Sequence, residues 1–235
     1  MKIKFLILFF FFSIAFVFGQ RKKVENLPKF DSRRIHFGFT LAVNYTDFVI
    51  RFADDFKNFD SLRIIESEKQ PGFNLGIITD LHLHPNLNLR FLPSLVIASR
   101  NLEYSFAPKD SMVKKTAKTE STFLLFPLNL KYRSARVNNF AAYILGGGSY
   151  SYDLSSQKDV QGSTGSDIII KLARDDIYYE VGVGFDFFLQ YFKFSPELKF
   201  SFGTKNILIN DNTIFTNPIQ QLNSKVFLIS FHFEG

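Results

Sequence analysis

The sequence has 235 residues, of which 46% are hydrophobic and 21% charged, with 31 Phe and no Cys or Trp. A chain this apolar is not intrinsically disordered, and its length suits one domain with a sizeable core. The absence of Cys excludes disulfides, a thiolate nucleophile, Cys-ligated metal sites and a lipid-modified N-terminal Cys. The formal net charge of +6 is scattered along the chain, so the basic stripe typical of nucleic-acid binding is missing.

The first residues predict export. Two lysines precede an apolar run at residues 5–18, and the small residue Gly19 follows it. This order is typical of a cleavable signal peptide, which we place at residues 1–19, so that the mature chain begins at Gln20. An anchoring helix is the alternative, but the run is shorter than the roughly 20 residues that cross a bilayer. Removing the two lysines from the 28 basic residues leaves 26 against 22 acidic ones, a mild net charge of +4.

Residues 20–33 form a basic segment around Pro28. We interpret this segment as a solvated periplasmic tail, with a docking segment as the alternative. The cluster of basic side chains at this point consists of Arg21, Lys22, Lys23, Lys29, Arg33 and Arg34.

From residue 34 onward, large apolar residues alternate with small or polar ones, which is the period of a β-strand with two different faces. In the first run, the odd positions from Ile35 to Tyr45 are all large and apolar. We expect eight strands, at 34–47, 73–83, 87–98, 122–133, 140–152, 177–187, 192–202 and 227–234.

The connections alternate between short and long. Pro85 and Asn86 form a tight turn between the second and third strands, and short turns also join the fourth to the fifth and the sixth to the seventh. Long polar segments occupy the regions near 50–72, 104–120, 153–175 and 204–223. Membrane barrels have this pattern, with short periplasmic turns and long outer loops.

The size of the barrel decides which face of each strand points inward. A soluble lipocalin-like barrel is the alternative, but the interior of an eight-stranded barrel is only wide enough to be filled by side chains. The Phe, Leu and Ile of nearly every strand would overfill it, so we expect them to face lipid. Small residues suit the interior: Gly38, Ala42, Gly76, Gly182 and Gly184.

We therefore predict an all-β fold: an eight-stranded, antiparallel, up-and-down transmembrane β-barrel at residues 34–235, in the outer membrane of a Gram-negative bacterium. Closure leaves no strand edge unpaired in hydrocarbon. The aromatic residues near the end, Phe231 and Phe233, are typical of the last strand of such barrels.

Charged and His side chains on the inward face predict a paired network that fills the lumen, since a buried charge must be paired. The alternative is a proton or ion path. These inward residues are Asp80, His82, Arg90, Lys131, Arg133, Glu180, Asp186, Glu197, Lys199 and His232.

We predict no catalytic, cofactor-binding or metal-binding residues, no cofactor and no small-molecule substrate. His82 and His84 share a strand face but lack a third ligand. A lipid-modifying barrel enzyme would need a His close to a Ser. None of the four histidines, which include His36 and His232, is in a His-x-Ser arrangement, so such an enzyme is only a remote alternative. The glycines at 146–148 indicate bending or close packing of the strand.

Two long loops are interpreted as plain surface loops, with a partner contact as the alternative. The loop at 153–167 is rich in Ser and Gly. The loop at 206–223 also contains apolar residues, which are Ile207, Leu208, Ile209, Ile214 and Phe215.

Several stretches resemble the PorT family of outer-membrane proteins. The most specific is Phe126–Ser134, with the sequence FPLNLKYRS, and the others are Arg34–Thr40 with Asn44, Tyr143–Gly147 and Tyr152–Ser156. The resemblance implies a component of the type IX secretion and gliding-motility apparatus of Bacteroidota, with membrane lipid and other secretion proteins as partners. It implies no catalytic or ligand residues.

Overall fold

In the computed structural model of the chain, the described residues are 24–54, 62–107, 113–155 and 170–235. The predicted signal peptide at 1–19 and most of the predicted loop at 153–167 lie outside them. No helix in the described part of the chain is long and apolar enough to cross a membrane. The strands are β1 (Ile35–Phe52), β2 (Leu62–Glu68), β3 (Gln70–His84), β4 (Leu87–Phe91), β5 (Ser94–Phe106), β6 (Val113–Arg133), β7 (Phe140–Asp153), β8 (Asp175–Phe188), β9 (Lys193–Gly203) and β10 (Ile219–Glu234).

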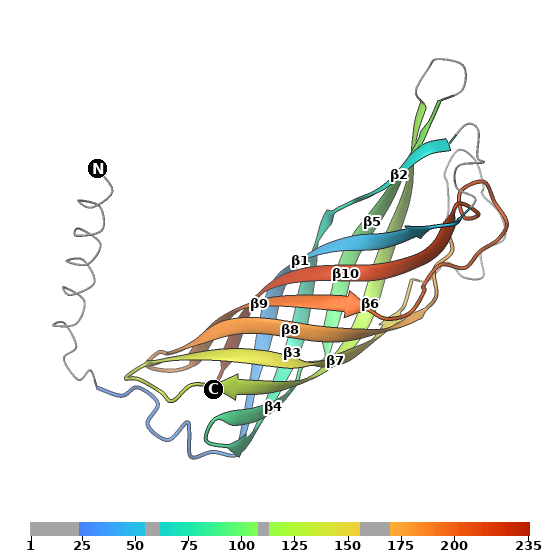
Figure 1. Cartoon of the computed structure of the whole chain (residues 1–235). Helices are drawn as coiled ribbons and strands as arrows, with labels where there is room; N and C mark the ends of the chain where they lie inside the picture. The colour runs from blue at the N-terminus through green and yellow to red at the C-terminus, as the bar shows by residue number, and fades with distance from the viewer. Residues whose placement is uncertain (1–23, 55–61, 108–112, 156–169) are drawn as a thin grey trace, which may run out of the picture.

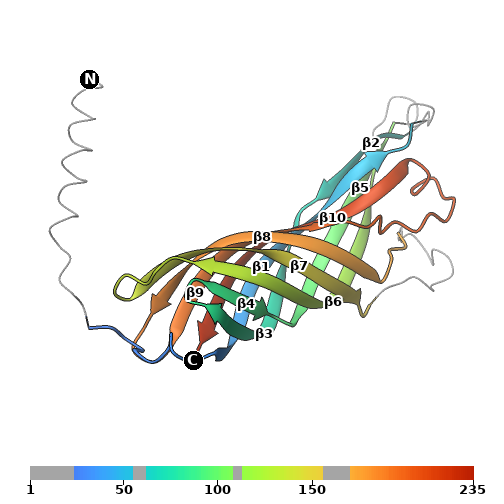
Figure 2. The same cartoon turned by 60° about the horizontal axis from the view of Figure 1, so that its bottom comes forward.

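These ten segments form one closed barrel (Figures 1 and 2). The barrel has eight transmembrane strands, because two of them are each divided into two segments. β2 and β3 continue one another across Lys69, and β4 and β5 continue one another across Leu92 and Pro93. β4 and β5 both pair with β6, and β1 closes the ring by pairing with β3 on one side and β10 on the other. All pairings are antiparallel, so the predicted eight-stranded up-and-down barrel is confirmed.

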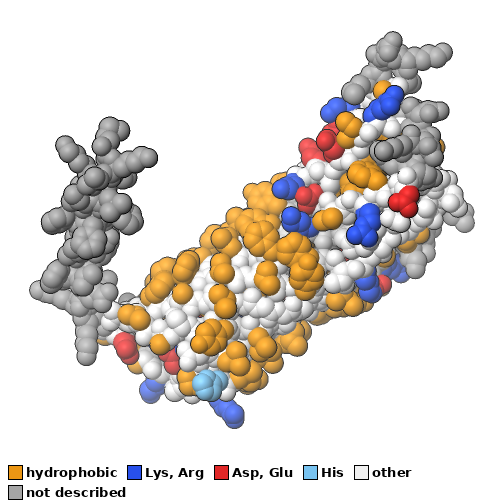
Figure 3. All heavy atoms as spheres, viewed as in Figure 1, with side chains coloured by type: hydrophobic (Ala, Val, Ile, Leu, Met, Phe, Trp, Pro, Cys, Tyr) orange, Lys and Arg blue, Asp and Glu red, His pale blue; other side chains and the backbone are white. Residues whose placement is uncertain are grey.

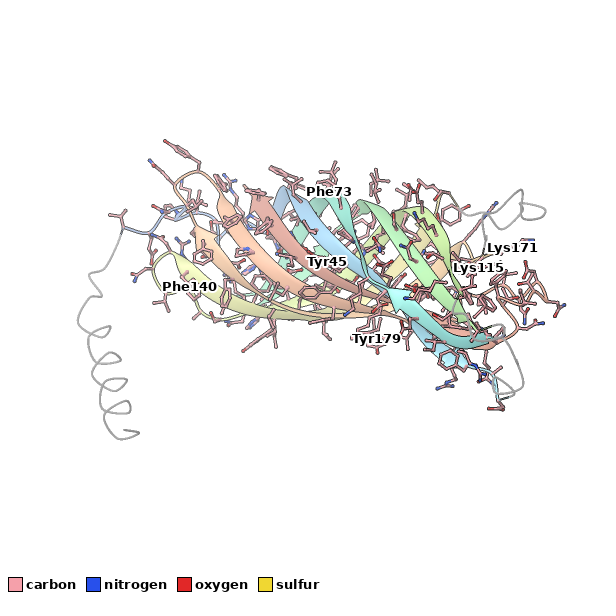
Figure 4. All side chains as sticks on the ribbon, turned by 90° about the horizontal axis from the view of Figure 1, so that it is seen from above. Tyr45, Phe73, Lys115, Phe140, Lys171 and Tyr179 are labelled. Atoms are coloured by element: carbon pink, nitrogen blue, oxygen red, sulfur yellow. The ribbon has the colours of Figure 1, made fainter. Side chains whose placement is uncertain are left out.

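The predicted outward face of the strands is confirmed. Phe37, Ile77 and Tyr132 expose about 60% of their surface, while the residues between the large apolar ones point inward. The apolar side chains form a belt around the barrel, and charged side chains gather beyond the belt, toward the end of the barrel where β2 lies (Figure 3). In the view from above, Phe140 lies toward one end and Lys115 and Lys171 toward the other (Figure 4).

Two of the predicted long loops are largely strand. β1 runs on to Phe52, β2 occupies 62–68, β5 reaches Phe106 and β6 begins at Val113. The prediction failed because the polarity of the two faces reverses beyond the belt. There the inward residues are apolar, such as Leu102 and Tyr104, and the outward ones are polar, so the segment reads as a polar loop.

A buried apolar cluster fills the barrel beyond the belt, and we call it the outer core. The predicted surface loop at 206–223 contributes to it, which corrects that interpretation: Ile207 and Leu222 are buried, although Ile214 remains exposed. The outer core consists of Phe48, Leu62, Ile65, Leu102, Tyr104, Ala117, Ile170, Leu172, Ile207, Ile219 and Leu222.

Candidate functional site

The other half of the barrel interior is polar and contains closely paired charges. Strand alternation points these side chains inward from β3, β4 and β6 to β10. We call the set the lumen network, and its members are Asp80, Arg90, Lys131, Tyr143, Glu180, Asp186, Lys193, Glu197, Lys199, His232 and Glu234.

Arg90 stands at the centre of the lumen network with only 1% of its surface exposed. Its guanidinium contacts three carboxylates at N to O distances of 3.2 Å (Asp80), 3.0 Å (Glu197) and 3.1 Å (Glu234). A planar fork of five N–H donors suits this role, because a Lys ammonium has fewer donors and no fixed geometry. Arg90 thus joins β3, β4, β9 and β10 through the lumen.

Each buried Lys of the network has a carboxylate partner. The Nζ to O distances are 2.8 Å for Lys131 and Asp186, 2.9 Å for Lys193 and Glu234, and 3.0 Å for Lys199 and Glu180. Pairing of this kind compensates for the loss of water around the charges.

Tyr143 connects these pairs. Its hydroxyl donates to Glu197 at 2.8 Å, and Lys131 Nζ lies 3.7 Å from the centre of its ring. Gly184 makes room for that ring, since a Cβ at position 184 would lie 2.4 Å from the Tyr143 hydroxyl. Gly147 is similar: a Cβ there would lie 2.2 Å from the carbonyl oxygen of Leu128, so close packing explains the central glycine of 146–148.

The predicted inward residues are found in the lumen, with one qualification. His82 is half-buried and lies near the short-turn end, with Nδ1 3.2 Å from Asn88 Oδ1. Sequence reasoning missed Lys193 and Glu234, although both stand at polar positions of their strands and parity alone would have found them. It also missed Tyr143, because the alternation in β7 is weak.

Among the described residues, a small cavity lies in the polar half of the lumen. The space between Thr40, Asn74, Lys199 and His232 amounts to about 10 Å³, close to the volume of one water-sized sphere. The buried and paired side chains around this cavity agree with the predicted network of paired charges in the lumen.

The described part of the N-terminal segment, residues 24–33, lies across the short-turn end of the barrel, and we call it the cap. Phe30 is 6% exposed and stacks on His36 with the ring centres 3.7 Å apart. It also meets Phe188 edge to face at 5.6 Å, and Lys193 Nζ lies 4.7 Å from its ring. These contacts correct the interpretation of the segment as a solvated tail.

Polar contacts hold the cap at two further points. Asp31 pairs with Arg133 at 2.8 Å and with Arg136 at 3.6 Å. The backbone N–H of Asn26 donates to Asn139 Oδ1 at 2.8 Å, and its side chain donates to the carbonyl of Phe188 at 2.9 Å. Two residues could have favoured the docked alternative, although the sequence analysis did not use them: Phe30 and Asp31, an aromatic and an acidic residue in a basic segment.

Among the described residues, the Ser, His and carboxylate groups of the lumen are not hydrogen-bonded in the order that a serine hydrolase requires. Ser195 Oγ donates to Asp186 at 2.6 Å, while His232 Nε2 lies 3.2 Å from Glu197. Activation of a serine requires a base in hydrogen-bond contact with its hydroxyl. Within the described residues, no group of three His, Asp or Glu side chains is placed to hold a metal ion.

The closed ring, its apolar belt and its filled lumen define a small β-barrel of the outer-membrane type. Residues 18–208 match the family model described as outer membrane protein beta-barrel domain. The chain belongs to this family, which places it in the outer membrane. No curated protein matches the sequence.

Solved outer-membrane barrels are similar to this chain at low identity. Ail, the attachment invasion locus protein of Yersinia pestis, has 10% identity and a TM-score of 0.40, with 86% of this chain and 100% of Ail covered. OprG from Pseudomonas aeruginosa has 18% identity and a TM-score of 0.44, with 86% and 94% covered. The outer membrane protease OmpT from Escherichia coli has 12% and 0.41, with 91% and 98% covered. Likeness at this level assigns no function.

Proposed function

We propose that this outer-membrane barrel supports type IX protein secretion, and gliding motility with it, through protein contacts and without catalysis. The proposal begins from the resemblance of Phe126–Ser134 and the accompanying stretches to the PorT family. Its partners would be other proteins of the secretion apparatus, in addition to the surrounding lipid.

The observation that carries the proposal is the cap held over a filled lumen. An eight-stranded barrel whose interior is occupied by buried side chains does not fit a cargo chain, so we place the role in secretion on the surfaces of the barrel. Two residues of the stretch that resembles the PorT family support this arrangement directly. Lys131 pairs with Asp186 in the lumen, and Arg133 pairs with Asp31 of the cap.

Deletion of the gene tests the proposal. Secreted and cell-surface proteins of the deletion strain are compared with those of the parent and of a complemented strain. We expect cargo proteins with the C-terminal sorting domain to accumulate in the periplasm, and complementation to release them. Unchanged surface delivery would contradict a role in secretion and leave only the barrel assignment.

Complementation with cap variants then tests whether secretion requires the periplasmic surface of the barrel. Phe30→Ala combined with Asp31→Asn removes the buried ring and the ion pairs that hold the cap. We expect this variant to assemble, as judged by heat-modifiable migration, and to restore secretion poorly. Lys29→Gln is the matched control, because Lys29 is exposed in the same segment. Full restoration by the double variant would show that the cap is dispensable.

A structural or adhesive barrel is the second candidate, and the outer core favours it. The core supports strands that extend beyond the lipid belt and present polar side chains outward. Loss of attachment to surfaces in the deletion strain, with normal cargo delivery, would favour this candidate.

A lipid-modifying enzyme is the remote third candidate. The His232 and His36 side chains are almost completely buried, at 1% and 2% exposure, which disfavours contact with a lipid substrate. We expect the lipid A of the deletion strain to have an unchanged mass spectrum, and an altered spectrum would revive the enzyme.

A further inference from the structure

A groove of about 350 Å³ lies on the outer wall of the barrel, at the rim of the apolar belt farther from the cap. It is separate from the lumen and does not depend on the proposed role in secretion. Strands β1, β9 and β10 and the junction between β2 and β3 form it. Its lining residues are Tyr45, Asp47, Lys69, Phe200, Lys225 and Phe227.

Aromatic rings form the apolar part of the groove. Tyr45 and Phe227 are register partners on β1 and β10, and their ring centres are 6.5 Å apart. Phe200 of β9 meets Phe227 at 4.8 Å. Tyr45 and Phe200 each expose about 40% of their surface, and Tyr45 stands on the wall in Figure 4. A row of partly exposed rings at a belt rim is typical of the membrane interface.

Two lysines form the polar part. Lys225 precedes Phe227 by two residues on the same face of β10, one step farther from the cap, and lies opposite Asp47 of β1. Lys69 stands exposed at the break between β2 and β3. Within the described residues, neither lysine forms an ion pair, and Asp47 Oδ1 accepts a hydrogen bond from the backbone N–H of Phe48. The three charged groups therefore have a net charge of +1.

We propose that this groove binds the phosphorylated head group of an outer-leaflet lipid, with an acyl chain against Tyr45, Phe200 and Phe227 and the phosphate between Lys69 and Lys225. The order of the groups supports this occupant. In barrels of this kind the long-loop end faces outward, so the rings lie toward the membrane and the lysines at head-group level. A lysine at head-group level attracts an anionic lipid head group electrostatically, and it does not attract a neutral head group in this way.

Native mass spectrometry of the full mature barrel in detergent tests the site. The probes are monophosphoryl lipid A and dephosphorylated lipid A with the same acyl chains. We expect the wild-type barrel to retain the phosphorylated lipid in preference, and K69Q combined with K225Q to retain about tenfold less of it. Asp47→Asn should increase retention, because it removes the negative charge beside the phosphate.

The matched control is K114Q combined with K118Q, which removes the same charge from exposed positions of β6. Heat-modifiable migration verifies that each variant is folded. Equal retention of the two lipids, or an equal loss in the control, would overturn the proposal, since lipid would then bind by apolar contact or by net charge alone. Displacement of the lipid by millimolar inorganic phosphate would overturn it too, because the site would then recognise free phosphate.

Discussion

The two halves of the barrel interior have opposite chemistry on one continuous set of strands. Next to the cap, the lumen network contains four cationic side chains and five carboxylates in close pairs. Beyond the lipid belt, the outer core is built of Leu, Ile, Phe, Tyr and Ala. What changes between the halves is the medium outside the wall. Lipid requires an apolar exterior and leaves the polar residues for the lumen, whereas water permits the ordinary arrangement of polar exterior and apolar core.

The two interiors also respond differently to change. A buried charge that loses its partner is left without water and without compensation, so one deletion affects several neighbours. An apolar cluster loses only the contacts of the atoms removed and the space they leave. Substitutions in each half test whether this difference holds.

We expect the largest effect from Arg90→Met in the lumen network. It leaves three carboxylates without their shared guanidinium, and the free energy of unfolding should fall by about 3–5 kcal/mol. Urea titration of the barrel in phospholipid vesicles measures this. Arg63→Met, at an exposed position of β2, is the control and should change little. If the free energy of unfolding of Arg90→Met lay within about 1 kcal/mol of the wild-type value, the distinction between the two halves would be wrong.

The next effect is expected from Leu222→Ala in the outer core. Leu222 is fully buried, so the substitution should destabilise its surroundings by about 2–4 kcal/mol. Hydrogen exchange followed by mass spectrometry should show faster exchange in β2 and the outer part of β5, with β8 and β9 unchanged. Ile214→Ala, at an exposed position of the connection between β9 and β10, is the control. Equal acceleration throughout the barrel would mean that the halves unfold together.

Gly184→Ala should have a smaller effect, about 1–3 kcal/mol, because the new methyl group collides with the ring of Tyr143. Urea titration again provides the measurement. Combining it with Tyr143→Leu should destabilise less than the sum of the two single changes, since the ring that causes the collision is gone. Strict additivity would place the strain elsewhere.

Lys114→Gln should have the smallest effect. Lys114 pairs with Glu103 on the outer wall beyond the belt, but its side chain is 65% exposed to solvent. Exposed pairs of this kind add little to stability. An unfolding midpoint in urea identical to wild type is expected, and a clear shift would show that charge pairs outside the lumen also matter.

The barrel itself could be predicted because lipid forces a strict alternation on each strand. The run beginning at Ile35 shows it without interruption, and most members of the lumen network follow from parity in the other strands. The alternation fails where the medium changes. The strand continues at Leu102 and Tyr104, but there the apolar side chains point into the barrel. The same alternation therefore marks the inward face in this region and the outward face in the belt.

Docking of the N-terminal segment was one of the two expected outcomes, but the contacts of the cap and the position of the groove could not be predicted, since each depends on contacts between distant parts of the chain. Phe30 touches His36, which is close in sequence, but also Phe188. Lys69 and Lys225 line one groove only because β1 lies between β3 and β10 in the closed ring. No local pattern specifies such neighbours.

The cap has a consequence for how assembly of this barrel can be followed. Its residues bind β1 at His36, β6 at Arg133 and the end of β8 at Phe188, which stand at separated positions around the ring. The cap can contact all three strands at once only after β1 has paired with β10 and the barrel is closed. Protection of the segment around Lys29 from trypsin should therefore appear late, and its time course would report the moment of closure in a refolding experiment or in an insertion assay.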